Sequence, residues 1–318
     1  MNLLESVRAV TGASGTGQAD WGAVAEAAKA ATEPGSLDLS AGERDGYAAD
    51  VRDARDRLRT VAGVEFDLPE TVDIQNRHHW IDANVRTIRR AMRPLEEHGP
   101  GTMPGVARVA NTGSMSVALA FLARHVLGQY DPLLLADGDE EHGLYFVHPN
   151  IRNAAAELGV EYPRFRRWIA LHEVSHAAEF GAAPWLSEHL ERRMERGVAA
   201  LANGRLDREA FRDLDVAMTA VEGYAELVMD RAFDAEYADL RAKVDARRRS
   251  GGDPLTRLLK RVLGLGLKRR QYERGADFFR AVADARDVET ATRVWERPEN
   301  LPTDAELDAP ERWLARIS

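Results

Sequence analysis

One short segment of the sequence combines residue types that could bind a metal ion and activate water. His172 and His176 enclose Glu173 in the order His-Glu-Val-Ser-His. In a helix, a spacing of four residues places both imidazoles on one face, one turn apart, where they can hold a single ion. Glu173 lies next to the first histidine and could reach a water bound to that ion. Zinc lowers the pKa of such a water to about 7, and the carboxylate would take its proton as the water attacks a carbonyl carbon.

A third metal ligand must come from outside this segment. The long form of the motif, H-E-x-x-H-x-x-G-x-x-H, requires Gly at position 179 and His at position 182, but the chain has Glu179 and Ala182 there. That form is therefore excluded. Glu179 shares the helical face of the two histidines but is too close in sequence to complete a tetrahedral site. We expect it to contact a ligand or the solvent instead of the metal.

Three downstream residues are candidates for the third ligand: Glu222, Glu226 and His189. We expect Glu222, because the adjacent Gly223 would let two helices approach closely. The sequence Glu-Gly-Tyr-Ala that starts at Glu222 is also similar to the Glu-Gly-Phe-Ala in which some gluzincin aminopeptidases place their zinc ligand. Glu226 would then accept a proton from the outer nitrogen of a ligating imidazole.

Other polar residues have less specific roles. Tyr272 could donate a hydrogen bond to an oxyanion, although a tyrosine buried in the core is an alternative interpretation. His148 could line the cleft or serve only the structure. His78 and His79 are adjacent, so they point to different sides of a helix and cannot both serve one site.

The elements that would carry these residues are mainly helices. The metal motif lies in a predicted helix that starts at Pro163 and ends before Gly181, and Glu222 lies in a predicted helix over residues 207–233. Residues 106–127 are apolar on nearly every side, which predicts a central, buried helix. A further helix is expected over 255–265, after a mobile loop at 246–254.

The β signal is confined to two short apolar runs. Pro132–Leu135 and Leu144–Val147 flank a polar segment that contains glycine, and this pattern predicts a hairpin with a long turn. We expect Leu144–Val147 to be an edge strand beside the cleft, because its backbone groups could then pair with an extended substrate.

The composition indicates a globular protein and excludes several classes. Of the 318 residues, 44% are apolar, which is ample for a core, and the net charge of −9 gives no indication of a nucleic-acid-binding surface. The absence of cysteine excludes a thiol nucleophile and cysteine ligands for zinc. Neither a signal peptide nor a membrane-spanning segment is visible, so we expect a cytoplasmic protein without a membrane partner.

Beyond the metal motif, five groups of residues carry a wider resemblance: Arg77-x-x-Trp80-Ile81-x-x-Asn84, Val221-Glu222-Gly223 with Ala225-Glu226-x-x-Met229-Asp230, Lys268-x-x-Gln271-Tyr272-x-x-Gly275-x-x-Phe278, Trp295-x-x-Pro298-Glu299-x-Leu301-Pro302-Thr303 and Trp313-Leu314-x-Arg316. In these segments the chain resembles the zincin-like metallopeptidases, a family with an archaeal and actinobacterial branch named for its association with deazaflavin-coenzyme biosynthesis. The resemblance implies a mostly helical zincin fold and a zinc site of two His and one Glu. It implies no particular substrate.

We therefore expect a mainly α (α+β) protein with a helical zincin-like fold and a small β-hairpin or sheet before the metal-binding helix. An N-terminal helical region, residues 1–128, would pack as one unit with a catalytic region, residues 129–318. The expected activity is zinc-dependent hydrolysis of an amide bond in a peptide or protein, with Glu173 as general base. One alternative is a zinc-binding scaffold or accessory factor of deazaflavin-coenzyme metabolism, and another is a helical interaction protein without metal.

Overall fold

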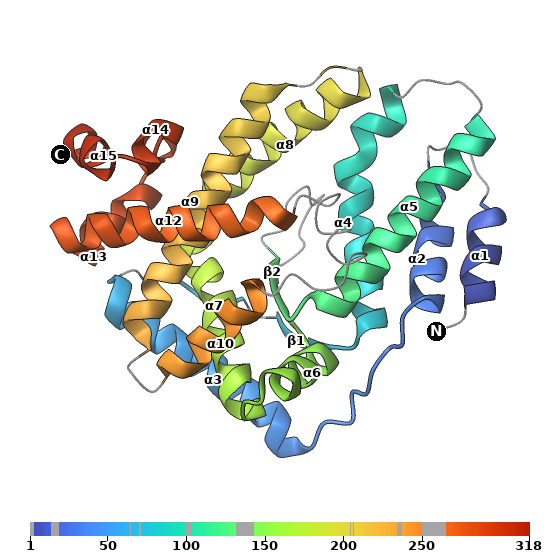
Figure 1. Ribbon diagram of the computed structural model, residues 1–318, viewed down its shortest axis with the longest axis horizontal. Coiled ribbons are helices and arrows are strands. Elements are labelled where there is room, and N and C mark those ends of the chain that lie inside the picture. Colours follow the sequence, from blue (N-terminus) through green and yellow to red (C-terminus); the bar gives the residue numbers. More distant parts are fainter. Residues whose placement is uncertain are drawn as a thin grey trace.

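The computed structural model describes residues 3–13, 19–63, 65–69, 71–98, 104–131, 143–203, 205, 207–233, 237–249 and 265–318. These residues form helices around one small sheet (Figure 1). In chain order the elements are α1 (Leu3–Thr11), α2 (Trp21–Ala30), α3 (Ala41–Ala62), β1 (Thr71–Gln75), α4 (Arg77–His98), α5 (Pro104–His125), β2 (Gly128–Asp131), β3 (Gly143–Val147), α6 (His148–Leu158), α7 (Tyr162–Ala182), α8 (Leu186–Ala202), α9 (Arg208–Ala232), α10 (Ala238–Arg249), α12 (Leu265–Ala285), α13 (Val288–Thr292), two short 3₁₀ helices (Arg293–Trp295 and Pro298–Asn300), α14 (Asp304–Leu307) and α15 (Pro310–Ile317).

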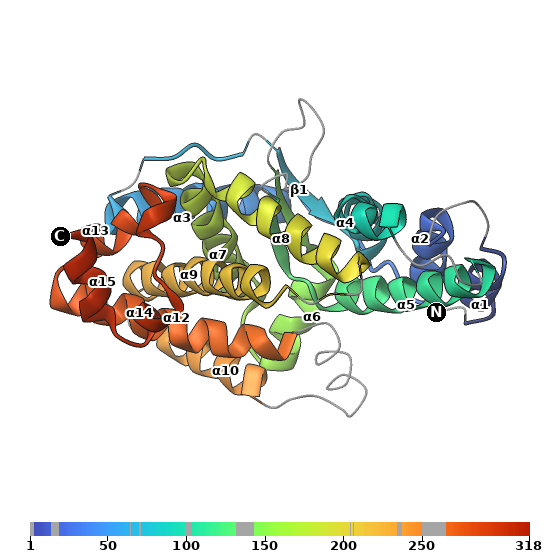
Figure 2. The ribbon, with the colours of Figure 1, turned by 90° about the horizontal axis from the view of Figure 1, so that it is seen from above.

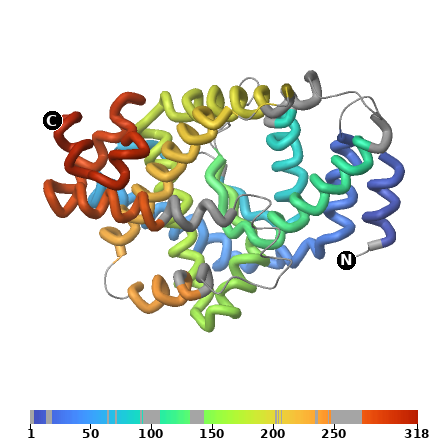
Figure 3. Tube along the Cα trace, turned by 45° about the horizontal axis from the view of Figure 1, so that its top comes forward, coloured from blue at the N-terminus to red at the C-terminus, as the bar shows by residue number. Residues whose placement is uncertain are grey.

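The mainly α fold with a small sheet before the metal-motif helix is confirmed. In Figure 2, α1, α2, α4 and α5 lie at one end of the molecule, and α12 to α15 lie at the other. Helices α7 and α9 lie between these two ends, as the trace in Figure 3 also shows. The metal motif therefore lies in the middle of the molecule.

The sheet has the strand order β1-β3-β2. β1 runs parallel to β3, and β2 runs antiparallel to it, so that Val72 and Tyr130 both pair with Leu144 from opposite sides. β3 is the central strand, and the prediction that it forms an edge is wrong. The physical reason is its uniformly apolar sequence, because Leu144, Phe146 and Val147 are all fully buried, as in a strand that is covered on both faces.

The other strands also differ from the prediction. The strand antiparallel to β3 is Gly128–Asp131, whereas the sequence predicts it at Pro132–Leu135, a run that lies outside the described residues. Glycine is rare in strands, so the sequence around Gly128 favours a strand that begins later, at the leucines that follow. β1 was not predicted, because its pairing with β3 joins segments about seventy residues apart and leaves no local signal.

Helix α7 forms the centre of the main core. It begins at Tyr162 with Pro163 in its first turn, where the missing N–H of proline costs nothing. Trp168, Ile169 and Val174 are at most 4% exposed, and the helix packs against α3, α6, α9 and β2. A helix that is apolar on nearly every side is buried by its neighbours, which makes it a rigid support for polar residues on the remaining face.

Helix α5 does not have the central position that its apolar sequence predicts. It packs with α1, α2 and α4, and Val117 on its outer face is 53% exposed. Its many alanines and glycines give it apolar character without the large side chains that a central core position needs. Among the residues that the structure describes, no helix combines the length and the hydropathy needed to cross a membrane.

The two expected regions of the chain share the sheet and the core. β1 and α3 precede residue 128, yet β1 pairs with β3 and α3 packs along α7. A second, smaller core lies between α2, α4 and α5 and includes Val24, Trp80 and Leu119. The division into residues 1–128 and 129–318 stays a prediction, and extensive contacts cross it.

Two predicted segments in the later part of the chain include residues that the structure does not describe. The predicted loop at 246–254 is helical in its first four residues, because α10 continues to Arg249. The remainder of that loop, and residues 255–264 of the helix predicted after it, lie outside the described residues.

Candidate metal centre

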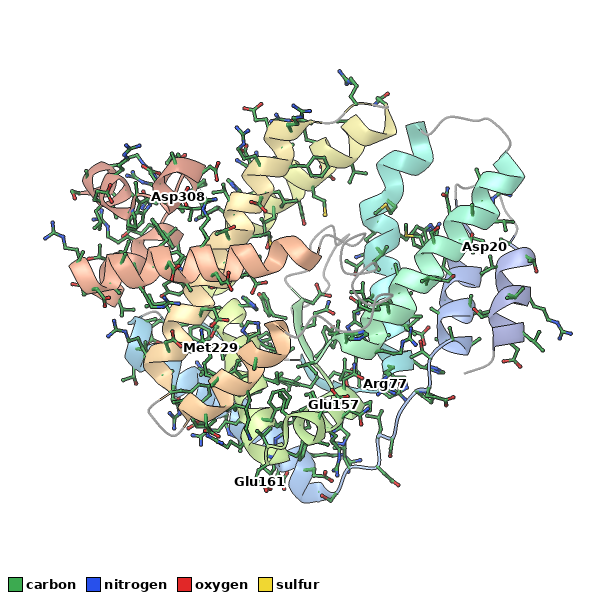
Figure 4. The ribbon with its side chains drawn as sticks, in the orientation of Figure 1. Asp20, Arg77, Glu157, Glu161, Met229 and Asp308 are labelled. Atoms are coloured by element: carbon green, nitrogen blue, oxygen red, sulfur yellow. The ribbon has the colours of Figure 1, made fainter. Side chains whose placement is uncertain are left out.

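Ligand atoms of His172, His176 and Glu222 converge at one point between α7 and α9. One nitrogen from each imidazole and one oxygen of the carboxylate all lie within 4.8 Å of one another. In the described part of the chain, this is the one cluster of His, Asp and Glu side chains with such geometry. The two helices can be followed in Figure 4, where Glu161 marks the residue before α7 and Met229 lies in the last turns of α9. Residues fifty positions apart thus meet as the sequence predicts.

The two histidines lie on one face of α7, as their spacing requires. Their ring centroids are 4.8 Å apart, with an angle of 76° between the ring planes. His172 also stacks on Trp168, four residues earlier, at a centroid distance of 6.1 Å and an interplanar angle of 3°. Trp168 is 4% exposed and held by the core, so it limits the rotation of the His172 ring. Sequence reasoning missed this role, although the spacing of four residues was visible.

Glu222 is positioned by the packing of α9 on α12. A Cβ atom at Gly223 would lie 2.3 Å from the carbonyl carbon of Gly275, and one at Gly275 would lie 2.2 Å from the carbonyl oxygen of Thr219. The two backbones therefore touch at this crossing. The sequence predicts that Gly223 lets α9 approach the helix of the metal motif. The structure corrects this expectation, because Gly223 lets α9 approach α12 instead. With Gly223 directed to α12, its neighbour Glu222 is directed to α7.

Glu179 contacts His176 and is completely buried. Its Oε2 lies 2.9 Å from Nδ1 of His176, one turn earlier in α7. Burial alone would lower the pKa of His176, but the hydrogen bond and charge of Glu179, together with Glu222 and Glu173, outweigh it and raise this pKa to about 9. Burial raises the pKa of Glu179 to about 7 although His176 opposes the shift. The pair fixes the imidazole so that Nε2 faces Glu222, whose Oε2 lies 3.9 Å away.

Glu173 points from α7 toward the edge strand β2. Its Oε2 accepts a hydrogen bond of 3.0 Å from the main-chain N–H of Tyr130, and it is 6% exposed. A Cβ atom at Gly128 would lie 2.5 Å from Cγ of Glu173, so the strand leaves room for this carboxylate only because residue 128 is glycine. Neither strand residue was predicted to contribute to the site.

Glu226 does not have the role that was expected of it. The predicted contact with a ligating imidazole is made by Glu179, whereas Oε2 of Glu226 lies 2.6 Å from Nη2 of Arg241. Arg241 comes from α10, a helix that the sequence analysis did not predict, and it also pairs with Asp230. The expected role of Glu226 is therefore wrong, because its buried carboxylate pairs with the guanidinium of Arg241.

His189 lies outside the converging group. It contacts Trp185 edge-on at 5.4 Å, and burial, with Arg193 and Arg192 nearby, lowers its pKa to about 4. Tyr272 belongs to α12, but its side chain lies outside the described residues. A catalytic role for Tyr272 stays a prediction.

His148 belongs to a separate buried cluster. Its Nδ1 lies 3.1 Å from the hydroxyl of Tyr47 and 3.2 Å from that of Tyr162. His78 contacts the carbonyl oxygen of Thr32, and His79 is exposed. These three histidines have structural or solvent environments and do not join the candidate metal centre.

The converging side chains fit a zinc ion in their chemistry. Two imidazole nitrogens and one carboxylate oxygen form a common donor set for catalytic zinc. Oε2 of Glu222 is buried and accepts no hydrogen bond from a described residue. A buried carboxylate oxygen without a donor is costly, and a cation beside the two imidazoles would offset that cost.

Comparison with known proteins supports the same kind of site. The sequence model of the family described as "Zincin-like metallopeptidase" matches residues 19–205 and 193–314. Among solved structures, a crystal structure described as "a putative hydrolase with a novel fold" from Chloroflexus aurantiacus is similar, with a TM-score of 0.73 and 30% sequence identity. The match covers 100% of this chain and 98% of that one. No curated protein sequence gives a significant match.

Proposed function

Because the chain belongs to the zincin-like metallopeptidase family, we propose that it is a zinc-dependent hydrolase that cleaves amide bonds in a peptide or protein. The observation that carries the proposal is the convergence of His172, His176 and Glu222 within 4.8 Å. In this proposal the three side chains hold zinc. Zinc, when bound, supplies Lewis acidity, which lowers the pKa of a water molecule to about 7 and stabilises negative charge on a carbonyl oxygen.

Glu173 acts as the general base in the proposed reaction. It follows His172 directly in α7, beside the candidate ligands, and its carboxylate contacts the attacking water molecule in this proposal. It accepts the proton of the attacking water and can return that proton to the leaving nitrogen. Its buried position keeps the carboxylate from bulk water, which would otherwise solvate it.

Glu179 orients one of the proposed ligands. With the Nδ1–H of His176 donating to Glu179, Nε2, which lies on the side of Glu222, is left to hold the proposed ion in place of a proton. A carboxylate behind a ligating imidazole also raises its basicity. The pair thus supports the assignment of His176 as a ligand through Nε2.

A measurement of metal content followed by a peptide-cleavage assay tests the proposal. Elemental analysis of the purified full-length protein should find about one zinc per chain, and a peptide library should be cleaved. Glu173→Gln should keep the zinc and lose at least about a hundredfold in kcat, because an amide cannot accept the proton. Glu188→Gln, on the exposed face of α8, is the matched control.

Each result bears on a different alternative. Protein that neither contains nor takes up a transition metal would refute the zinc hydrolase and favour a helical interaction protein. Protein that binds zinc but cleaves no member of the library, with Glu173→Gln indistinguishable from wild type, would favour a zinc-binding scaffold linked to deazaflavin-coenzyme metabolism. We also propose a cytoplasmic location, without nucleic acid or membrane as partner.

A further inference from the structure

The carboxylate of Glu173 lies against the free edge of β2. Its Oε2 is 3.0 Å from the main-chain nitrogen of Tyr130, and its Cγ, Cδ and Oε1 surround the space that a Cβ atom of Gly128 would occupy. The contact joins a residue of α7 to the backbone of a strand more than forty positions earlier. It is therefore a property of the fold and not of the local metal motif.

The register of the sheet determines which backbone groups of β2 face Glu173. The N–H of Val147 donates to the carbonyl oxygen of Leu127 at 2.9 Å, so Leu127 directs its backbone groups toward β3. In an antiparallel pair this orientation alternates, which turns the groups of Gly128 and Tyr130 away from β3. The N–H of Tyr130 would otherwise be an open donor of the edge strand, and here it donates to Glu173.

Helix α4 holds β2 through the side chain of Gln129. Trp80 donates from Nε1 to Oε1 of Gln129 at 2.8 Å, and Gln129 donates from Nε2 to Oδ1 of Asn84 at 3.1 Å. Asn84 in turn donates to the carbonyl oxygen of Trp80 at 2.9 Å. The amide of Gln129 is thus bound at both ends by one turn of α4. Trp80 and Asn84 belong to a sequence motif to which the proposed reaction assigns no role.

We propose that the main-chain N–H of Tyr130 is a positioning group for Glu173, in a β2 strand that α4 holds in place through Gln129. The inference rests on the proposed role of Glu173 as general base. The N–H binds one carboxylate oxygen and keeps the side chain directed from α7 toward β2. Gly128 is required because a side chain at this position would occupy the volume of the carboxylate. Trp80 and Asn84 act on Glu173 only through the strand.

Amide exchange at Tyr130 tests the hydrogen bond without any substrate. The chain has seven tyrosines, so zinc-loaded full-length protein labelled with [¹⁵N]tyrosine gives few amide signals. Tyr130→Phe identifies the signal of residue 130 by its loss. Glu173→Ala should accelerate exchange of this amide about tenfold or more, because it removes a charged acceptor, whereas Glu173→Gln keeps an acceptor oxygen and should change it less. Equal exchange rates in wild type and Glu173→Ala would overturn the proposal.

A proline at position 130 tests the consequence for catalysis. Tyr130→Pro removes the N–H but no hydrogen bond of the sheet, because this N–H faces away from β3 and an edge strand tolerates proline there. Tyr130→Ala removes the ring and keeps the N–H. On a library peptide that wild type cleaves, kcat of the proline variant should fall about tenfold or more below that of the alanine variant, at similar KM. A rise in KM alone would overturn the positioning role and assign the N–H to substrate binding.

Gly128→Ala gives an independent test of the same contact. Its methyl group should displace Glu173, accelerate exchange of the Tyr130 amide and leave the zinc content unchanged. Gly42→Ala, where a Cβ atom meets nothing within 4 Å, is the matched control. Unchanged exchange in Gly128→Ala would contradict the inference. The exchange results are independent of the tests of the proposed function. If the protein lacks zinc or Glu173→Gln stays active, the proposed function is refuted even when the Tyr130 amide exchanges as expected. If the exchange rates do not change, this inference is refuted even when zinc is present and Glu173→Gln is inactive.

Discussion

Oε2 of Glu179 lies 2.9 Å from Nδ1 of His176, and this carboxylate is completely buried. A buried carboxylate needs a compensating charge or donor, and the imidazole supplies one. In return, the carboxylate fixes the ring and makes its other nitrogen a better metal ligand. In the proposed zinc site, two residues of one helix, His172 and His176, would hold the ion, and a third, Glu179, orients one of them.

Glu179→Gln should weaken zinc binding by about tenfold to a hundredfold, because a neutral amide holds the Nδ1 proton less strongly than a carboxylate. Competition with a chromogenic chelator at pH 7.5 measures the affinity. Glu188→Gln, which alters an exposed ion pair on α8, should leave the affinity unchanged. An affinity equal to that of wild type would show that Glu179 has only a packing role.

Gly223→Ala should destabilise the protein by about 1–3 kcal/mol or more, because its Cβ atom would lie 2.3 Å from the backbone of Gly275 and neither helix can yield without moving the other. Urea denaturation measures the loss in free energy of unfolding. Gly42→Ala in α3 has open space around the new Cβ atom and should be neutral or slightly stabilising. A Gly223→Ala variant as stable as wild type would contradict the tight crossing of α9 and α12.

The local part of the site could be predicted from sequence. His172, Glu173 and His176 lie within one helix, and a spacing of four residues is enough to place two side chains on one face. Glu222 could be predicted as their companion because a glycine follows it, although that glycine faces α12 and not α7. The mainly α fold followed from the helical periodicity of most segments.

The long-range part of the site could not be predicted. The contact of Glu173 with Tyr130 depends on the register of β2, and the first strand of the hairpin was placed four residues too late. Glu179 contacts His176, which is one of the two outcomes expected of it. Glu226 does not lie behind an imidazole as expected, because Arg241, on an unpredicted helix, pairs with it. Such pairings join distant segments and leave no periodic signal in either one.

His148 should make the protein less stable in acid. Burial lowers its pKa against the opposing charge of Glu43, and Arg152 and Arg166 lower it further. A base with a lowered pKa binds more protons when unfolded, so its contribution to stability is fully present above the unfolded pKa of about 6.5 and is lost as pH falls below it. Its Nδ1 also faces the hydroxyls of Tyr47 and Tyr162 and could no longer accept from them once protonated.

His148→Asn should therefore flatten the decline in the free energy of unfolding between pH 7 and pH 5. The decline that one such group causes is at most about 1.4 kcal/mol per pH unit. Urea denaturation at several pH values measures it, with the exposed His79→Asn as control. If both variants keep the wild-type slope, another group is responsible for the acid sensitivity.

The identity of the third metal ligand can be tested by comparing Glu222, Glu226 and His189. We expect Glu222→Gln to lose zinc affinity by at least about a hundredfold, because it removes a carboxylate whose oxygen converges with the two imidazoles. Glu226→Gln should keep zinc but lose stability, since Arg241 would lose a partner that is 2% exposed. His189→Asn should keep zinc, because its ring contacts Trp185 and not the converging group. Chelator competition and urea denaturation on the same three variants separate binding from folding. Loss of zinc in Glu226→Gln or His189→Asn, with Glu222→Gln still loaded, would show that the site is completed by a different residue.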